Sequence, residues 1–137
     1  MSYKILLVDD DKEIVETLKL RLIREDYEVV TAYDGEEALA KVKQDNPDVI
    51  LLDLLMPKLN GFEVLKEIRE KFNDKWRPVI IISAQTELET VHKSYSLEAD
   101  HYLTKPCRVG DVLKAIGLMV QLIPQHKSIG EMKEPHS

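Results

Sequence analysis

The chain has 137 residues, of which 44% are hydrophobic and 32% charged, a mixture that fits one globular domain around one core. Its 25 acidic residues outnumber its 19 basic ones, and the net charge of −6 argues against general nucleic-acid binding. No apolar run approaches the roughly 20 residues of a membrane span, and the first residues lack the layout of a signal peptide. The one cysteine, Cys107, cannot form an internal disulfide, which indicates a reducing, cytoplasmic location.

Short apolar runs alternate with amphipathic stretches in the first half of the chain. The apolar run 4–9 ends in aspartate and predicts a strand buried on both faces. A helix is predicted over about 12–25, because apolar residues recur there at helical spacing and Asp11 is a good N-cap. A second strand is predicted over 27–32, and a second helix with acidic residues in its first turn over 34–44.

The same alternation continues in the second half. The third predicted strand, 48–53, is again apolar and again ends in aspartate. The apolar pattern of the fourth predicted helix is weaker than that of the others and rests on Leu88, Val91 and Tyr95. The remaining predicted elements are a helix over 61–72, a strand over 77–84, the weak helix itself over 87–97, a short strand over 101–104 and a last helix over about 109–122.

Five strands alternating with five helices predict an α/β domain built on a parallel sheet. Right-handed crossovers would place helices on both faces of this sheet. We assign the domain to residues 1–123. From Pro124 on, residues 124–137 are polar and lack periodicity, so we interpret them as a C-terminal tail or the stub of a linker.

Polar side chains stand at the predicted carboxyl ends of four strands. They are Asp9 and Asp10 after the first strand, Asp53 after the third, Ser83 after the fourth and Lys105 after the fifth. In an open α/β sheet, ligands bind beyond these ends. Three converging carboxylates repel one another unless a cation joins them, and Mg²⁺ prefers such oxygen ligands. The set therefore predicts transfer of a phosphoryl group to or from a carboxylate.

Five segments resemble the receiver domains of bacterial response regulators, in particular the single-domain chemotaxis and sporulation-relay types. The segments are "ILLVDDD", "DGEEAL", "PDVILLDLLMPKLNGFEVLKEIR", "PVIIISA" and "ADHYLTKP", and they follow one another over about residues 3–122. One segment alone is weak, but five at these spacings are specific for this family of two-component signalling. The resemblance implies a flavodoxin-like fold, with a five-stranded parallel sheet of order 2-1-3-4-5 flanked by five helices.

The resemblance also implies a role for each acidic residue. Asp53 matches the phosphoacceptor, which takes its phosphoryl group from a phosphohistidine. Asp10 matches the acid that binds Mg²⁺ directly, and Asp9 matches the acid that acts largely through water. Leu55 would give its backbone carbonyl to the metal, for which Mn²⁺ could substitute, and Lys105 would pair with a phosphoryl oxygen.

Ser83 and Tyr102 match the pair that switches the conformation of the family. The Ser83 hydroxyl is expected to move towards the phosphoryl group, and the Tyr102 ring to turn inward after it. The peptide before Pro106 is expected to be cis. Pro57 and Gly61, in the segment after the phosphoacceptor, are expected to have structural roles.

The partners implied by the resemblance are a phosphoryl donor and an effector. The donor would be a sensor histidine kinase or a histidine phosphotransfer protein, meeting the first helix and the loop after Lys105. The effector would read the surface formed by the fourth helix, the fifth strand and the fifth helix. We expect a monomer or a phosphorylation-dependent dimer that contacts neither nucleic acid nor membrane, and whose only catalysis is its own phosphorylation and dephosphorylation.

Four positions depart from the common family pattern or tune it. Glu98 stands where many relatives have glycine, and a left-handed helix end would strain a glutamate, so we expect a different shape there. Cys107 replaces the usual phenylalanine, and we expect its thiol to be inert. Leu55 and Gln85 flank the site, and because an apolar Leu55 cannot position water, we expect slow self-dephosphorylation.

Other interpretations of these residues stay open at this point. Asp9 and Asp11 formally make the Asp-x-Asp of a haloacid-dehalogenase-type phosphatase, although the chain is short for that core and the nucleophile would be Asp9. A pseudo-receiver that only binds partners is the third alternative, although such modules commonly lack one of the site residues found here. Asp11 is best explained as a helix cap, Ser83 could also be a cap, and Tyr102 could be a packing residue.

Overall fold

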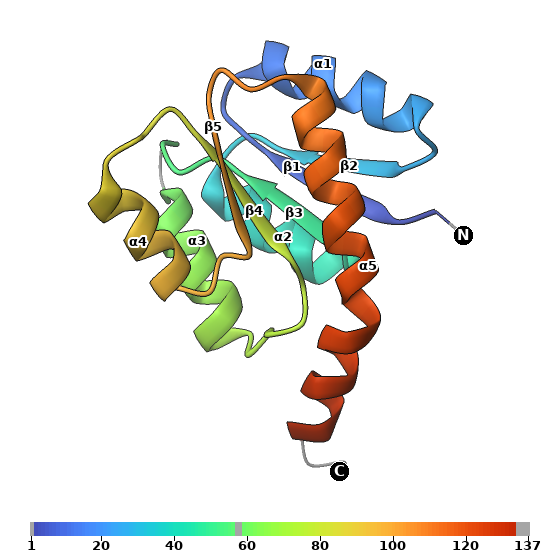
Figure 1. Cartoon of the computed structure of the whole chain (residues 1–137), viewed down its shortest axis with the longest axis vertical. Helices are drawn as coiled ribbons and strands as arrows, with labels where there is room; N and C mark the ends of the chain where they lie inside the picture. The colour runs from blue at the N-terminus through green and yellow to red at the C-terminus, as the bar shows by residue number, and fades with distance from the viewer. Residues whose placement is uncertain (1, 57–58, 134–137) are drawn as a thin grey trace.

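The computed structural model describes residues 2–56 and 59–133, with side chains described as far as Ile123. Five parallel strands form one sheet in the order β2-β1-β3-β4-β5 (Figure 1), which confirms the fold class and the strand order. The strands are β1 (Lys4–Val8), β2 (Glu28–Ala32), β3 (Val49–Leu52), β4 (Val79–Ser83) and β5 (His101–Thr104).

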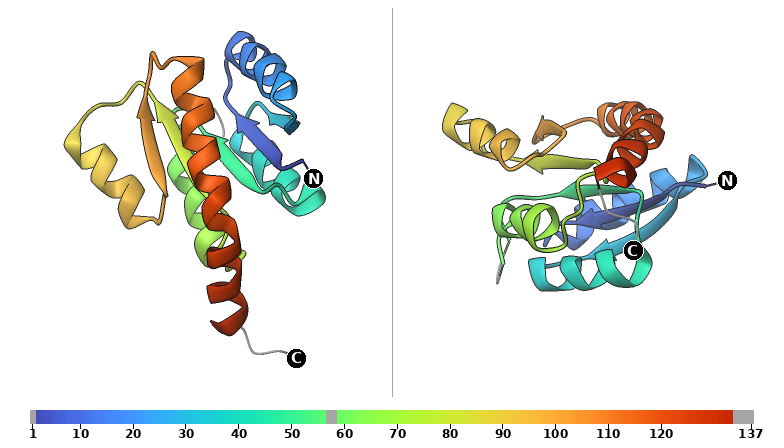
Figure 2. Two further views of the ribbon diagram at one scale, coloured as in Figure 1. Left: turned by 45° about the vertical axis from the view of Figure 1, so that its right-hand side comes forward. Right: turned by 90° about the horizontal axis from the view of Figure 1, so that it is seen from below.

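Helices cover both faces of the sheet. They are α1 (Lys12–Arg24), α2 (Gly35–Asp45), α3 (Gly61–Lys66), the π-helical turn η1 (Glu67–Lys71), α4 (Leu88–Ser96) and α5 (Val109–Lys133). Figure 2, right, shows α5 on one side of the sheet and α2 and α3 on the other. No helix among the described residues is long and apolar enough to cross a bilayer.

The three inner strands β1, β3 and β4 are rich in apolar residues because both of their faces are buried, whereas the edge strands β2 and β5 are only partly buried and carry polar residues. In β1, Ile5 and Leu7 pack into the core layer under α1 and α5, whereas Leu6 and Val8 pack into the layer under α2 and α3. Successive side chains of a strand point to opposite faces, so a continuous apolar run fills both layers. The polar residues that follow each strand are left at the edge of the sheet.

The predicted helix 61–72 is divided in the structure. Its second half is the π-helical turn η1, in which the Phe72 amide donates to the Glu67 carbonyl at 2.9 Å, one residue beyond the α-helical partner. The wider turn carries Arg69, which is 3% exposed. The sequence analysis did not predict a buried charge at this position, which lies between Ile68 and Glu70.

The apolar face expected for the fourth helix is not buried. Leu88 is 71% exposed and Tyr95 47% exposed. Of the nine residues of α4, Ser94 alone is buried, and its hydroxyl donates to the Thr90 carbonyl. The physical reason is position: α4 lies beside β5, the edge strand, where little sheet remains for it to cover (Figure 1).

The last helix is longer than predicted. We expected it to end at about residue 122, but α5 continues to Lys133 and extends past the sheet (Figure 1). The predicted helix end is therefore wrong, while the interpretation of residues 124–137 as a tail or linker stub stays a prediction, and residues 134–137 lie outside the described part. Pro124 removes only one backbone donor, and the residues after it include Gln, Lys, Glu and Met, which favour helix.

The turn after the fourth helix has the left-handed backbone conformation that we did not expect at a glutamate. Glu98 has φ 68°, in the left-handed region, so the prediction of a different helix end is wrong. The Glu98 carbonyl accepts a hydrogen bond from Arg69 Nε at 3.1 Å, and the carboxylate accepts one from Lys75 Nζ at 2.7 Å. These bonds hold glutamate in a conformation that glycine would adopt without strain.

Candidate functional site

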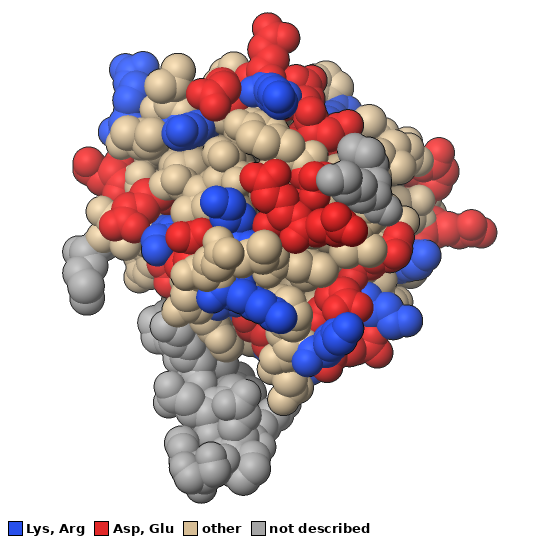
Figure 3. All heavy atoms as spheres, turned by 180° about the vertical axis from the view of Figure 1, so that it is seen from behind, with Lys and Arg blue, Asp and Glu red and all other residues tan. Residues whose placement is uncertain are grey.

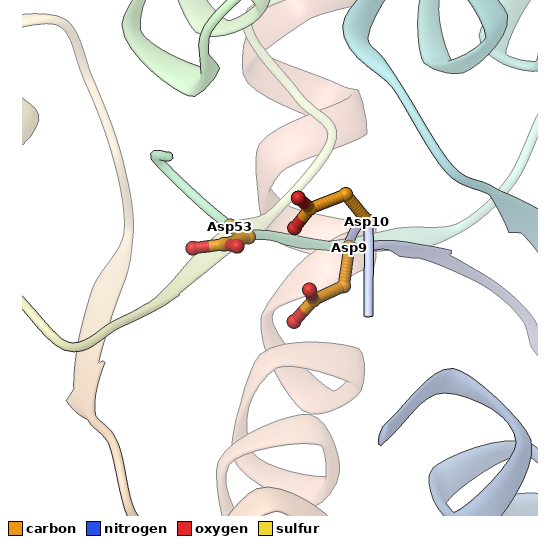
Figure 4. Close-up of side chains that lie close together, drawn as sticks. All are labelled: Asp9, Asp10 and Asp53. Atoms are coloured by element: carbon orange, nitrogen blue, oxygen red, sulfur yellow. The ribbon is translucent and has the colours of Figure 1, made fainter. Parts of the chain in front are cut away.

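The three predicted carboxylates meet at the carboxyl end of the sheet. Because β1 and β3 are neighbours, with Val8 opposite Leu52, the residues that follow them lie side by side. Oxygens of Asp9, Asp10 and Asp53 lie within 4.8 Å of one another (Figure 4). Asp9 and Asp53 are buried and Asp10 is exposed. The pairing of β1 with β3 thus brings together the three acids that the sequence analysis expected to converge.

Lys105 is the ammonium of this cluster. Its Nζ donates to Asp9 Oδ2 at 2.8 Å and lies 3.5 Å from Asp53 Oδ2. The peptide from Lys105 to Pro106 is cis, as expected. One ammonium against three carboxylates leaves a net negative site made of hard oxygen donors, and this composition fits a divalent cation such as Mg²⁺.

The surroundings of Asp53 disfavour its charged form. Burial and the charge of Asp9 raise the pKa of Asp53 to about 6, while Lys105 and the Leu55 amide act in the opposite direction. Burial alone would lower the pKa of Lys105, but its hydrogen bond to Asp9 and the charge of Asp53 outweigh burial, and the net pKa is raised. Lys105 therefore stays charged at neutral pH, and Asp53 is an unusually basic carboxylate.

Ser83 and Tyr102 are both hydrogen-bonded to the backbone of Gln85. The Ser83 hydroxyl is fully buried at the end of β4 and accepts a hydrogen bond from the Gln85 amide at 3.1 Å. Tyr102 Oη donates to the Gln85 carbonyl at 2.6 Å. Burial raises the pKa of the Tyr102 hydroxyl, so it remains a donor at neutral pH. The loop after Ser83 is thus tied to β5 by the tyrosine that the sequence singled out.

The segment after Asp53 approaches the site closely. The Leu55 amide donates to Asp53 Oδ1 at 3.4 Å, and the Leu55 side chain is 57% exposed. Gly61 lies against the backbone of the third strand's end: a Cβ there would meet the Asp53 carbonyl oxygen and would come within 2.6 Å of the Leu54 Cα. This close approach requires glycine. Pro57, the other residue expected to be structural, lies outside the described residues.

Asp11 is a helix cap, as expected. Its Oδ1 accepts hydrogen bonds from the Glu13 amide at 3.0 Å and the Ile14 amide at 3.3 Å. The Asp11 amide donates in turn to Asp9 Oδ1 at 3.0 Å. The cap therefore also orients one of the acids in the cluster.

The comparison with protein families decides the identity of this fold and site. The model of the response regulator receiver domain matches residues 5–117. The chain belongs to the response-regulator receiver family. Receivers are the signalling switches of two-component systems. Membership in this family excludes the haloacid-dehalogenase alternative.

Relatives of known structure or function agree with this assignment. The chain is 43% identical over 106 residues to the alkaline phosphatase synthesis transcriptional regulatory protein PhoP of Bacillus subtilis, covering 77% of the chain and 43% of PhoP. It therefore spans less than half of that relative. The Vibrio cholerae chemotaxis protein CheY4 is 34% identical, with a TM-score of 0.81 over 87% of this chain and 99% of CheY4. The BeF3-activated receiver domain of DrrB is 30% identical, with a TM-score of 0.78 over 88% of this chain and 99% of its own.

An apolar hollow lies beside the acidic site of this receiver. It measures about 490 Å³ and lies between α1 and the loop after β5, with Ile14, Leu18, Pro106, Cys107 and Val109 among its lining residues. Burial raises the pKa of the Cys107 thiol, which agrees with the expectation of an inert cysteine. On the face in Figure 3, acidic side chains are interspersed with lysines and arginines over much of the surface.

The sequence did not predict a second polar cluster, at the opposite end of the receiver sheet. It joins Arg69 to Asp100, and Arg77 to Asp74. Both arginines are less than 5% exposed. The available signal was an arginine beside the buried Ile68, at a helix position where the apolar pattern predicts burial.

Proposed function

We propose that this receiver accepts a phosphoryl group on Asp53 from a sensor histidine kinase or a histidine phosphotransfer protein, in a Mg²⁺-dependent reaction. The observation that carries the proposal is the position of Asp53. It is a buried carboxylate with a pKa of about 6, within 4.8 Å of two further acids and 3.5 Å from a lysine. A carboxylate that is basic but still largely ionised at pH 7 is a suitable nucleophile.

In the proposed reaction an Asp53 carboxylate oxygen attacks the phosphorus of the donor's phosphohistidine. The phosphorus–nitrogen bond breaks, and the imidazole nitrogen keeps its electron pair and takes up a proton from water. The Lys105 ammonium meets the phosphoryl oxygens, for which its place beside Asp53 is suited. Attack of water on the same phosphorus reverses the modification, and this self-dephosphorylation is the only other activity that we assign.

The metal site of the proposal uses the residues around Asp53. Asp10 and Asp53 would hold Mg²⁺ through their carboxylates, Leu55 through its backbone carbonyl, and Asp9 largely through water. The charge balance of the cluster supports this set, since Lys105 offsets only one of three carboxylates. When bound, Mg²⁺ supplies positive charge that offsets the repulsion between the acids and the phosphoryl oxygens.

Phosphorylation would then shift the population of two conformations. The Ser83 hydroxyl turns towards the phosphoryl group, and the loop it belongs to carries Gln85, whose carbonyl is already bonded to Tyr102. Movement of Ser83 is therefore passed to β5. The face of α4, β5 and α5, with the exposed Leu88, Tyr95 and Leu118, would be read by an effector or a second phosphorylated copy.

The donor would dock on the apolar hollow between α1 and the loop after β5. It adjoins the acidic site, because Lys105 lines both. We further propose that residues 1–123 form the receiver unit, that it works in the cytoplasm, and that it does not itself contact nucleic acid. The single cysteine supports the cytoplasmic location, and the net charge of −6 argues against binding of nucleic acid.

Asp53→Asn tests the proposed phosphoacceptor. The full chain is incubated with acetyl phosphate and Mg²⁺, and its intact mass is measured. The wild type and Asp11→Asn are expected to gain the mass of one phosphoryl group, whereas Asp53→Asn is not. Modification that persists in Asp53→Asn but disappears in Asp9→Asn would refute the assignment.

A further inference from the structure

We propose that Arg69 is a positioning residue for the switch pair Ser83 and Tyr102, acting through Asp100 at the opposite end of the sheet. The inference rests on the proposed function, because it concerns how movement at Ser83 reaches Tyr102. It assigns a role to a buried polar cluster that lies far from the acidic site in the fold.

The guanidinium of Arg69 joins the loop after η1 to the turn between α4 and β5. From the π-helical turn η1, Nη1 donates to the Asp74 carbonyl at 2.9 Å, Nε to the Glu98 carbonyl at 3.1 Å, and Nη2 to Asp100 Oδ2 at 3.0 Å. Arg69 is 3% exposed, so these bonds lie in a poorly solvated environment. The planar fork of arginine holds several acceptors in one geometry, which lysine cannot do.

Asp100 connects this fork to the two strands that carry the switch pair. Its Oδ2 accepts a hydrogen bond from the Val79 amide at 2.8 Å, and its own amide donates to the Val79 carbonyl at 2.9 Å. Val79 is the first residue of β4, and Asp100 directly precedes β5. The two strands are therefore fixed to each other at their starts, with Tyr102 two residues beyond Asp100.

The helix between these strands depends on the same anchor. Apart from Ser94, no residue of α4 is buried, so apolar packing contributes little to its position. The segment is held instead at its start by the Tyr102 bond to Gln85, and after its end by Arg69 and Lys75 on Glu98. A displacement at Ser83 can turn Tyr102 only if the far end of this segment stays in place, and Arg69 provides that fixed end.

Arg77 offers a matched control. It is 4% exposed, and like Arg69 it contacts Asp74. Its other hydrogen bonds go to the Pro47 carbonyl and Asn46, on the side of β3 rather than β5. Replacing either arginine removes a buried charge, but only Arg69 reaches Glu98 and Asp100.

The experiment uses the full chain with beryllofluoride and Mg²⁺, and follows backbone amides by ¹H–¹⁵N NMR, with urea unfolding alongside. Arg69→Met and Arg77→Met are both expected to lose stability to urea. At saturation, the Gln85 and Tyr102 amides should reach the wild-type shift in Arg77→Met but less than half of it in Arg69→Met. A complete shift in Arg69→Met would overturn the inference, since a merely structural role leaves the endpoint unchanged.

Two further outcomes are distinguishable. If Arg69→Met does not fold, Asp100→Asn is the deciding variant, because it keeps an oxygen for the Val79 amide and weakens the bond to Arg69. An incomplete shift at Tyr102 supports the inference, and a complete one overturns it. If the wild type itself shows no shift at Ser83 or Tyr102 although beryllofluoride binds, the proposed switch fails and the inference fails with it.

Discussion

Lys105 is hydrogen-bonded to Asp9, with Nζ 2.8 Å from Oδ2, and lies farther from Asp53, at 3.5 Å. The ammonium therefore neutralises the neighbouring acid more strongly than the candidate phosphoacceptor. Asp53 is left as a buried carboxylate whose charge is only partly balanced, and its pKa is about 6. Ionised Asp53 thus destabilises the metal-free fold at neutral pH.

Asp53→Asn should stabilise the metal-free chain in a pH-dependent manner. The pKa of Asp53 is about 6 in the folded chain, against 3.8 for an ordinary aspartate, so the penalty of ionising it is fully present above pH 6 and disappears below about pH 4. The difference in free energy of unfolding between variant and wild type should change by about 2 kcal/mol over this range, in favour of the variant at the higher pH. Urea unfolding in EDTA from pH 4 to 7.5 measures it, and a difference independent of pH would contradict the assigned cause.

The stability of variants at the adjacent residues Asp10 and Asp11 should respond differently to Mg²⁺. A ligand that binds only the folded chain raises its stability with concentration. Asp10→Asn should lose most of this Mg²⁺-dependent rise in melting temperature, since Asp10 is a member of the acidic cluster. Asp11→Ala should keep the rise but lose about 1 kcal/mol in all conditions, because it removes the cap of α1. Equal responses of the two variants would contradict the metal site.

Gly61→Ala should disturb the site through its backbone. The added methyl group would overlap the Asp53 carbonyl and the Leu54 Cα, and such overpacking costs about 1–3 kcal/mol. Phosphorylation by acetyl phosphate should slow as well. Gly110→Ala is the control: apart from its chain neighbours and the adjacent backbone of its own helix, nothing lies within 4 Å of the added Cβ, and alanine favours the helix, so urea unfolding should show unchanged or slightly increased stability.

Glu98→Gly should stabilise the chain, although it removes the ion pair with Lys75. The left-handed conformation at φ 68° costs a side chain about 1–2 kcal/mol, part of which is lost again because glycine is more flexible when unfolded. We expect a net gain of about 0.5–1 kcal/mol in urea unfolding. Glu98→Ala keeps the strain and loses the carboxylate, so it should show no gain. A stabilised alanine variant would point to charge, not backbone strain.

Leu55→Asn should shorten the lifetime of the phosphorylated chain severalfold. Leu55 is exposed beside Asp53, and an amide there can hold water that an apolar side chain cannot. Phosphate release after removal of acetyl phosphate gives the rate. Leu20→Asn is the control. Leu20 is an exposed leucine on α1, and its variant should release phosphate at the rate of the wild type. Faster release in the wild type than in Leu55→Asn would contradict the expectation.

The sequence predicted best where local chemistry decides the outcome. A strand buried on both faces is apolar, so β1, β3 and β4 were recognised from their apolar runs, and an aspartate before a helix caps it, as Asp11 does. The sequence predicted less well where the outcome depends on residues that are remote in the chain. Leu88 and Tyr95 have helical spacing, but their exposure depends on whether the sheet extends beneath α4. Glu98 was expected to avoid a strained turn because its supports, Arg69 and Lys75, are remote in the chain.

By itself, the sequence of this receiver determined which acids, hydroxyl and lysine stand at the ends of the strands, because these polar residues directly follow or close the runs that predict strands. Only the tertiary structure decided that Lys105 pairs with Asp9, that Tyr102 is bonded to the Gln85 backbone carbonyl, and that Arg69 is bonded to Asp100, directly before β5. Such contacts join residues far apart in the chain, and their geometry is set by strand order and packing rather than by any local pattern.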